Sequence, residues 1–459
     1  MKKPCCVLSV ALYVTALATS PAWAAETVKI GVIYPLTGNA ASAGQSAKDA
    51  INLGVEIVNT AHPDLNALPL GATAGLPNLG GAKIELDEAD HQGNPQVGQQ
   101  QTLRLITQDH VVAMLGSYHS SVSLVATAVA ERQGIPYLVA DSVALNITGR
   151  GFKWTFRTGP IASDFAKAYA GFLTDLKNTG RKIDKIAIVN ENTDYGTSVA
   201  ASIQDAAKAA NINVAAQIPY NANSSDVSAQ VIQLKTLQPD VVIFVSYTAD
   251  TILYFRTMKN LDYLPPIIIG DDAGFSDPTF IPNVGDLAQG AINRSAYDIG
   301  KPGSNSYIVN EMFKAKYGRD LDDTSARWMQ GFLVLADAIN RAGSTEPDKV
   351  QAALQATDLK SDQLMIGYKR GKIRLNRPEY ARLDFLDSAE GQAICLGLAR
   401  EFGDWQARIA DERLALKPTT DGAYQTTATM QSQFVVSRLP RQVRLQTIFP
   451  AHHQQRHEA

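Results

Sequence analysis

Residues 111–134 read VVAMLGSYHSSVSLVATAVAERQG, and this stretch decides the fold. Its first five residues form a continuous apolar run, which is typical of a strand buried on both faces. From Val122 onward, apolar side chains recur at helical spacing until Gly134, a residue that commonly ends a helix. The short turn at 116–121 consists mostly of small residues. Strand, turn and helix in this order predict one unit of an α/β sheet.

The turn places two hydroxyls, those of Ser120 and Ser121, at the start of the predicted helix. A helix N-terminus attracts anions because its free N–H groups and the helix dipole both present positive partial charge. We therefore interpret Ser120 and Ser121 as groups that hold the carboxylate of a small ligand. The alternative is that one of them only caps the helix. This stretch alone favours the capping interpretation.

Composition is that of an ordinary globular protein. The chain has 459 residues, enough for two domains, with 45% hydrophobic and 19% charged residues. A net charge of −3 does not favour nucleic acid or an anionic membrane as a partner. The three cysteines, Cys5, Cys6 and Cys395, have no metal-ligand spacing. We predict neither a metal nor a cofactor.

The N-terminus has the features of a signal peptide. Lys2 and Lys3 precede the apolar run 7–19, and Ala22-Trp23-Ala24 fits a small-x-small cleavage site. Cleavage would follow residue 24, so residues 1–24 would be removed on export. No later segment is long and apolar enough to span a bilayer.

From Val28 onward strands and helices alternate, which implies a parallel sheet covered on both faces. Ligands of such sheets bind beyond the carboxyl ends of the strands, here after Leu36, Leu115 and Ala140. A Leu-, Pro- and Gly-rich insertion at 62–81 is interpreted as a loop. Besides the unit at 111–134, the predicted strands are 29–36, 83–90 and 136–140, and the predicted helices are 44–59 and 95–108.

A second array of the same kind follows, so we predict two lobes with a cleft between their facing loops. Its predicted strands are 185–189, 214–218, 241–245 and 266–270, and its predicted helices are 195–210, 226–237 and 251–260. Three further helices, at 304–317, 325–342 and 347–356, are expected to return to the first lobe.

Four segments in order resemble a known family. They are Gly31 to Gly38 (GVIYPLTG), the turn at 116–121, Asp194-Tyr195-Gly196, and Pro239-Asp240-Val241-Val242. Together they are similar to the periplasmic solute-binding proteins of branched-chain amino-acid-type ABC transporters, over about residues 28–368. The resemblance implies a type I periplasmic binding protein fold, with two doubly wound parallel-sheet lobes joined by a three-segment hinge. The N-terminal lobe would comprise 25–158 with 295–365, and the C-terminal lobe 159–294.

The resemblance also implies roles for individual residues. Ser120 and its neighbours would receive the ligand's α-carboxylate, and Asp272 would pair with its ammonium group. The turn at Asp141-Ser142 would add backbone and hydroxyl contacts. Aromatic residues would form the walls of the pocket. The complete set of expected ligand-binding residues is Ser120, Ser121, Tyr118, Asp141, Ser142, Tyr195, Tyr247 and Asp272.

Two positions depart from the amino-acid-binding pattern. Ala43 stands where relatives often have an aromatic residue, and Val143 where they often have a hydroxyl. The pocket is therefore expected to be wider, and the prediction is a carboxylate ligand that need not carry an amino group. The expected function is that of a monomeric periplasmic protein that delivers this ligand to ABC transporter membrane subunits. The alternatives are a ligand-sensing regulator of the same fold, or a binding protein for an aromatic acid, amide or urea-type solute.

An enzyme is a further rival, in which His91, His110 or His119 activates Ser120. Adjacent His and Ser residues do not by themselves form an activated nucleophile, and no Gly-x-Ser-x-Gly surrounds Ser120. We therefore predict no enzymatic activity and no catalytic residues.

Residues 369–459 do not continue the family pattern. They are Arg-rich, without alternating strands and helices. Read one base later, permitted codons for residues 373–381 can encode Phe-Asp-Ser-Thr-Gly-Gln-Asn-Thr-Leu, which is similar to the family's usual ending. We interpret 369–459 as an aberrant, poorly ordered tail that a frameshift near 369–372 produced. The alternative is a genuine divergent extension.

Overall fold

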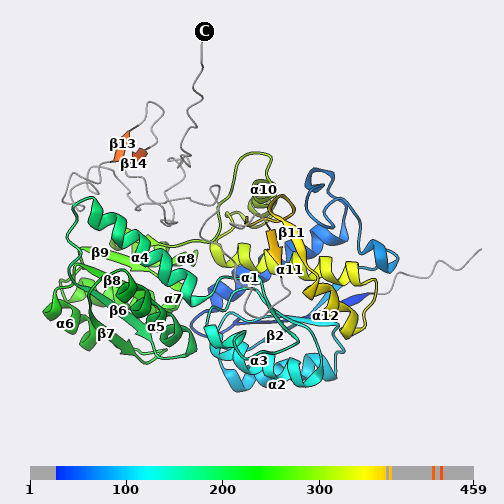
Figure 1. The fold of residues 1–459 in the computed structure, drawn as a ribbon, viewed down its shortest axis with the longest axis horizontal. Coiled ribbons are helices and arrows are strands. Elements are labelled where there is room, and N and C mark those ends of the chain that lie inside the picture. The colour runs from blue at the N-terminus through cyan, green and yellow to red at the C-terminus, as the bar shows by residue number, and fades with distance from the viewer. Residues whose placement is uncertain (1–26, 368–371, 375–415, 419–423, 427–459) are drawn as a thin grey trace, which may run out of the picture.

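The computed structural model describes residues 27–367 and the short segments 372–374, 416–418 and 424–426. Two five-stranded sheets, each with helices on both faces, form two lobes (Figure 1). All strands in both sheets run parallel. The predicted two-lobed α/β fold is therefore confirmed.

The first sheet has the strand order β2-β1-β3-β4-β5. Val32 and Ile33 on β1 illustrate why the strands of this sheet are continuous apolar runs in the sequence. The two side chains point to opposite faces, and each joins a different hydrophobic core. The strands are β1 (Val28–Tyr34), β2 (Ile84–Asp90), β3 (Ala113–Gly116), β4 (Tyr137–Val139) and β5 (Thr155–Arg157).

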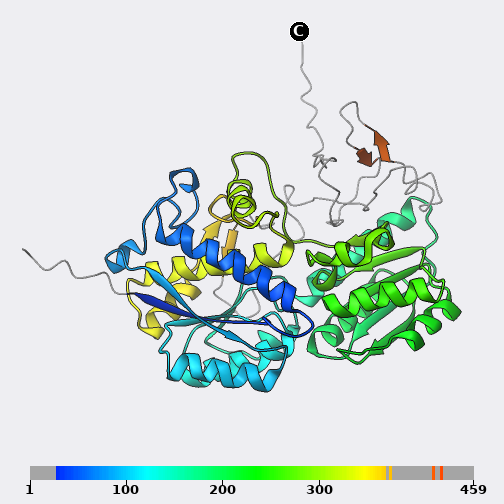
Figure 2. The same cartoon turned by 180° about the vertical axis from the view of Figure 1, so that it is seen from behind.

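Helices cover both faces of this sheet. On the face of Val32 lie α1 (Ala41–Asn59), α11 (Asp323–Ala342) and α12 (Pro347–Gln355). On the face of Ile33 lie α2 (Pro95–Thr107) and α3 (Ser120–Gln133). Figure 2 shows the blue helix α1 and the yellow helix α11, far apart in sequence, side by side on the first lobe.

The second sheet has the order β10-β9-β8-β6-β7. Its strands are β6 (Ile186–Glu191), β7 (Val214–Tyr220), β8 (Val241–Val245), β9 (Ile267–Gly270) and β10 (Ala291–Asn293). Its helices are α4 (Ala162–Asn178), α5 (Asp194–Ala209), α6 (Ser228–Leu237), α7 (Thr248–Asn260), α8 (Ala273–Ser276) and α9 (Phe280–Val284). Side chains of β8 alternate between two cores, with Ile243 on the side of α4 and α5 and Phe244 on the side of α6 and α7.

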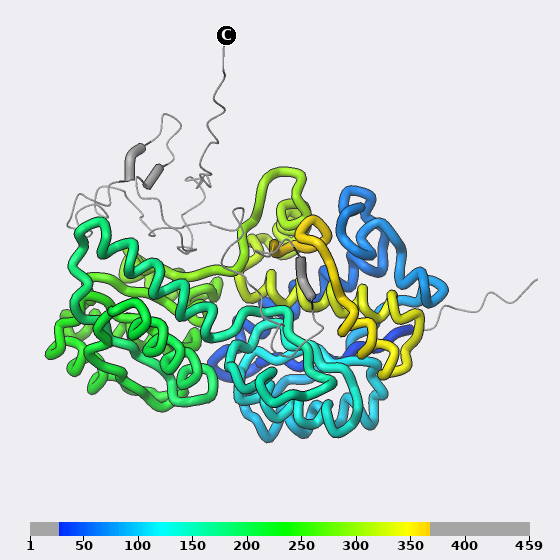
Figure 3. The backbone as a smooth tube through the Cα atoms, viewed as in Figure 1, coloured from blue at the N-terminus to red at the C-terminus, as the bar shows by residue number. Residues whose placement is uncertain are grey.

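The chain passes between the lobes twice within residues 27–367. It enters the second lobe after β5 and returns after β10, and Figure 3 traces this return from green to yellow. The helices after the return, α10 (Asn305–Tyr317), α11 and α12, lie on the first lobe as predicted. Two of the three expected hinge crossovers are thus described.

The predicted elements agree with the observed ones to within a few residues at each end. The insertion at 62–81 is a loop with two single 3₁₀ turns, η1 (Pro63–Leu65) and η2 (Pro77–Leu79). Sequence reasoning missed β5, α4, α8, α9 and β10. Strands β5 and β10 have only three residues each, too few for a periodic pattern to be recognised.

Residues beyond 367 take part in two small antiparallel pairs. Strand β11 (Asp358–Lys360) pairs with β12 (Lys372–Arg374), and β13 (Leu416–Pro418) pairs with β14 (Tyr424–Thr426). The remainder of the tail at 369–459 and the predicted signal peptide at 1–24 lie outside the described residues. Among the described helices, none has the length and apolar character that crossing a membrane requires.

Gly196 provides a test of how closely the second lobe packs. A Cβ atom added here would lie 2.0 Å from the Glu191 carbonyl oxygen, so Gly196→Ala forces the start of α5 away from β6. Overpacking of this kind costs about 1–3 kcal/mol. We expect a lower midpoint of thermal unfolding, measured by circular dichroism. Gly367→Ala is the matched control, since nothing lies within 3.9 Å of the added atom. Equal midpoints for the two variants would contradict this packing.

Candidate functional site

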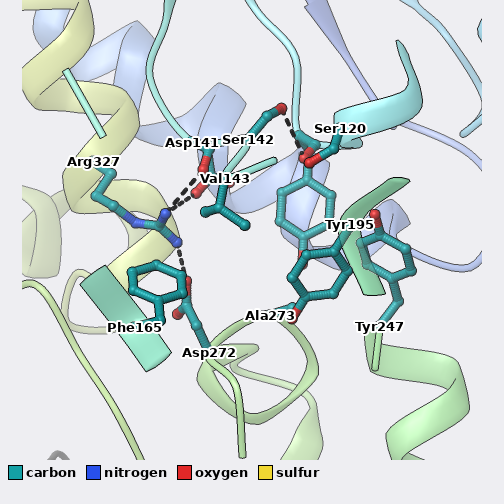
Figure 4. A pocket seen from close by; sticks show the side chains of 11 residues that line it. Ser120, Asp141, Ser142, Val143, Phe165, Tyr195, Tyr247, Asp272, Ala273 and Arg327 are labelled. Atoms are coloured by element: carbon teal, nitrogen blue, oxygen red, sulfur yellow. Dashed lines mark hydrogen bonds and ion pairs between the residues drawn. The ribbon is translucent and has the colours of Figure 1, made fainter. Parts of the chain in front are cut away.

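The loops at the carboxyl ends of the strands enclose a cavity between the two lobes (Figure 4). It contains about 280 Å³ of space that no protein atom fills, part of which is open to solvent. The first lobe contributes the turns after β3 and β4, and the second contributes those after β6, β8 and β9. Helices α4 and α11 complete the wall. The lining residues are Tyr118, Ser120, Asp141, Ser142, Val143, Phe165, Tyr195, Tyr247, Asp272, Ala273 and Arg327.

The turn after β3 brings the start of α3 to this cavity. Gly116 ends β3 with a φ of +154°, and a Cβ there would lie 2.8 Å from Ile33, so a small residue is needed. The helix begins at Ser120, with His119 at the N-cap position and no side-chain capping hydrogen bond. The Ser120 hydroxyl accepts instead from the Ala144 N–H at 3.3 Å. The capping interpretation of Ser120 is therefore wrong.

Ser121 differs from Ser120 in its position. It is half-buried and does not line the cavity. Both residues lie in the first turn of α3, where the Val122 and Ser123 N–H groups donate to the His119 carbonyl oxygen but those of Ser120 and Ser121 lie ahead of the first helical hydrogen bond. Ser120 can thus offer a hydroxyl and an N–H to an anion, whereas Ser121 can offer its N–H.

A set of buried hydroxyls fixes the shape of this turn. The Ser142 hydroxyl lies 2.6 Å from the Ser123 hydroxyl and 3.1 Å from the Tyr118 carbonyl oxygen, and it also contacts the Ser117 carbonyl oxygen. Because these contacts occupy it, the Ser142 hydroxyl positions the turn instead of extending into the cavity.

Arg157 holds the neighbouring loop after β4. Its guanidinium is fully buried and donates to the Ser142 and Ala144 carbonyl oxygens at 2.7 and 2.9 Å. Burial lowers the pKa of Arg157 to about 9. The arginine therefore ties the turn after β4 to the end of β5.

Aromatic rings from both lobes form one side of the cavity. The Tyr247 ring lies 5.6 Å from Tyr118, 4.5 Å from His119 and 5.1 Å from Tyr195, measured between ring centroids. These are contact distances for aromatic pairs. The Tyr195 hydroxyl donates to the Asp271 carboxylate at 2.8 Å, so its ring rather than its hydroxyl faces the cavity.

The opposite side of the cavity is a buried ion cluster around Arg327. The Arg327 guanidinium on α11 contacts Asp141 at 2.5 Å and Asp323 at 2.8 Å, and it also donates to Asp272. Asp272 follows β9, so this last pair joins the two lobes. Arg294 lies 3.1 Å from the same Asp272 carboxylate. All five side chains are at most 5% exposed.

Burial and charge act in opposite directions on these carboxyls. Burial raises the pKa of Asp141 to about 6, although Arg327 lowers it. Burial also raises the pKa of Asp272, against the effect of Arg327. For Asp323 the opposing effects of burial and of Arg327 and Arg294 leave the pKa below its ordinary value. The arginines therefore offset part of the effect of burial on Asp141 and Asp272 and outweigh it on Asp323.

His119 and His91 lie beside the serine turn without the arrangement of a catalytic pair. Their rings meet edge to face at 5.4 Å, and burial lowers the pKa of His119 to about 4. Neither imidazole has a hydrogen bond to the Ser120 hydroxyl among the described residues. The described part of the chain also contains no cluster of His, Cys, Asp or Glu that could hold a metal.

The structure brings together seven of the eight residues predicted to bind ligand, and Ser121 is the exception. Three lining residues, Phe165, Ala273 and Arg327, were not predicted. Ala43 is buried in the core of the first lobe and does not line the cavity, so the expected widening at Ala43 is not observed. Val143 does line it.

Comparisons with known proteins agree with this architecture. Residues 27–380 match the family model described as periplasmic binding protein. The Leu/Ile/Val-binding protein homolog 8 of Brucella suis biovar 1 is 33% identical over 402 residues, covering 84% of this chain and 93% of the relative. Homolog 7 of Brucella abortus is 30% identical over 401 residues, covering 84% and 95%.

Solved structures show the same fold. The leucine-binding protein LivK of Thermotoga maritima has a TM-score of 0.65 and 23% identity, covering 77% of this chain and 93% of that protein. An ABC transporter solute-binding protein of Rhodopseudomonas palustris, in complex with 3,4-dihydroxybenzoic acid, has a TM-score of 0.64 and 21% identity, covering 78% and 90%. Members of this family bind solutes and are not enzymes, and the family implies a periplasmic location. The chain belongs to the periplasmic binding proteins, and within them to the type I proteins of the branched-chain amino-acid type.

Proposed function

We propose that this protein captures a small carboxylate-bearing solute between its lobes and delivers it to the membrane subunits of an ABC importer. The observation that carries the proposal is the position of Ser120 and the start of α3, which line a cavity that both lobes enclose. A bound carboxylate would accept hydrogen bonds from the Ser120 hydroxyl and from the Ser120 and Ser121 N–H groups at the start of α3. The protein would act as an exported monomer.

Closure of the lobes follows from the distribution of the contacts. The carboxylate would be held by the first lobe, and Tyr195 and Tyr247 of the second lobe would cover the remainder of the ligand. A ligand that touches both lobes stabilises the closed form by the contacts that only this form makes. The importer would then recognise the closed pair of lobes.

The class of the solute is a separate question. Solved relatives include a branched-chain amino-acid transporter protein with isoleucine and Rhodopseudomonas palustris proteins with benzoate and 3,4-dihydroxybenzoic acid. The carboxylate-binding site proposed here, formed by Ser120 and the start of α3, can accommodate amino acids and aromatic acids alike. A ligand-sensing regulator of the same fold would bind the carboxylate in the same way, but the predicted signal peptide favours the transport role.

A thermal-shift screen of amino acids, short amides and aromatic acids tests the proposal, because a ligand that binds only the folded state raises its unfolding temperature. We expect carboxylates to give the largest shifts. A stabilising set made only of solutes without a carboxylate would contradict the proposal.

The variant Ser120→Ala tests the proposed hydrogen bond from the Ser120 hydroxyl to the ligand's carboxylate. Using the strongest carboxylate from the screen, we expect calorimetry to show a loss of affinity of tenfold or more, since charge-assisted hydrogen bonds contribute about 1.5–3 kcal/mol. Ser121→Ala is the matched control, because its side chain does not line the cavity. An equal effect of both variants would contradict the assignment to Ser120.

A further inference from the structure

The carboxylate expected to meet a ligand's ammonium group already has its partners within the protein. One oxygen of Asp272, Oδ1, accepts from the Ser276 hydroxyl at 2.6 Å. The other, Oδ2, accepts from Arg327 and lies 3.1 Å from Arg294. The side chain of Asp272 is 5% exposed. Two guanidinium groups and a hydroxyl therefore surround the position that an ammonium group would occupy.

Other contacts within the first lobe hold Arg327 in its position beside Asp272. Within the first lobe its guanidinium contacts Asp141 at 2.5 Å and Asp323 at 2.8 Å, and it donates to the Asp141 carbonyl oxygen at 3.1 Å. Asp323 is itself fixed by the Ser295 hydroxyl at 2.8 Å. The first lobe thus holds Arg327 in place, and Asp272 of the second lobe meets it where the lobes come together.

Two other acids at this end, Asp141 and Asp271, also accept hydrogen bonds within the protein. Asp141 accepts from the Trp328 indole N–H at 3.3 Å in addition to its pair with Arg327. Asp271, next to Asp272, accepts from the Tyr169 and Tyr195 hydroxyls. A ligand ammonium would have to displace one of these donors, which would leave a buried polar group, or the Arg327 charge, without its partner.

Between Ser120 and Arg327 the cavity offers mainly apolar and aromatic surface. Val143, Phe165, Ala273 and the ring of Tyr195 line it there (Figure 4). This surface suits a hydrocarbon or an aromatic ring, whereas an ammonium group placed against it would lose its hydration without an ionic partner.

We propose that Arg327 is a specificity-determining residue that takes the place of a ligand's ammonium group on Asp272, so that the site selects apolar or aromatic carboxylic acids over the corresponding α-amino acids. The inference rests on the proposed function and names its solute class. Arg327 supplies the positive charge that bridges the lobes, and the ligand supplies the carboxylate and the apolar body.

Matched pairs of ligands that differ only in the α-ammonium group test the inference on the wild-type protein. The pairs are 4-methylpentanoate with leucine and 3-phenylpropanoate with phenylalanine, measured by calorimetry at pH 7.5. We expect each acid to bind at least tenfold more tightly than its amino-acid partner. Equal or tighter binding of the amino acids would overturn the inference and leave the proposed function standing. If neither series binds, the inference also fails, and the thermal-shift screen of carboxylates then decides the proposed function.

The variant Arg327→Met tests whether the preference for acids over amino acids depends on Arg327. Without the guanidinium, Asp272 loses its inter-lobe cation and an ammonium group can pair with it, so the ratio of amino-acid to acid affinity should rise at least tenfold. Arg327→Lys keeps the charge and should retain the wild-type preference. It provides the test if the methionine variant does not fold. A wild-type ratio in Arg327→Met, or an inverted ratio in Arg327→Lys, would overturn the assignment.

Discussion

Arg327→Met is expected to lower the free energy of unfolding by about 3–5 kcal/mol, as removal of one partner from a buried ion pair does. Three buried carboxylates, those of Asp141, Asp272 and Asp323, contact this guanidinium. Methionine fills a similar volume but brings no charge, so these carboxylates must either remain unpaired or take up protons. We expect the thermal midpoint without ligand to fall by on the order of 10 °C at pH 7.

The matched control is Arg104→Met on the surface of α2. Arg104 also pairs with an aspartate, Asp109, but both side chains are at least 26% exposed. Exposed pairs contribute about 0–1 kcal/mol, so this variant should unfold within a few degrees of the wild type. If both variants lose the same stability, the cluster around Arg327 does not hold the lobes as described.

Asp250→Asn is expected to stabilise the protein at alkaline pH by roughly 3–4 kcal/mol. Asp250 on α7 is 2% exposed and accepts from the Tyr220 hydroxyl at 3.1 Å. Burial raises its pKa from 3.8 to about 7. Between pH 4 and 7 the folded state therefore binds more protons than the unfolded state, and wild-type stability falls as pH rises through this window.

The asparagine variant has no such proton to lose, so its advantage should be small near pH 4 and complete above about pH 8. Chemical denaturation at several pH values measures this difference. Asp226→Asn is the control with the opposite sign, since hydrogen bonds from Ser228 lower the pKa of that exposed carboxyl. A pH-independent effect of Asp250→Asn would contradict the burial of an ionisable carboxyl at this position.

The fold could be predicted because its central strands are buried on both faces. Segments such as Val241–Val245 must be apolar throughout, and each is followed by a helix with its own periodic pattern. The same logic fails for β5 and β10, each of three residues at the edge of its sheet. Their place is determined by pairing with β4 and β9, which no local pattern encodes.

The site was predictable where it consists of residues that follow strand ends. Ser120 and Asp141 follow strand ends named in the sequence analysis, and the resemblance to the family supplied Tyr247 and Asp272. All four line the cavity because topology brings the carboxyl ends of parallel strands to one edge. Arg327 was not predicted, since it lies near the start of the sequence-distant helix α11 and does not follow a strand. A charged residue among the buried side chains of that helix, four residues after Asp323, was the available indication.

Sequence reasoning also could not distinguish a side chain that contacts a ligand from one that positions others. Ser142 and Asp272 have the right chemistry and the right place, yet Ser142 is occupied by the turn after β3 and Asp272 by Arg327. These partners come from other elements, and only the three-dimensional arrangement reveals them.

A crystal structure of the complex with the strongest carboxylate from the screen tests the central claim most directly. We expect the ligand between the lobes, with its carboxylate about 3 Å from the Ser120 hydroxyl and from the N–H groups at the start of α3. A ligand bound outside the cavity, or one whose carboxylate faces away from this turn, would contradict the account.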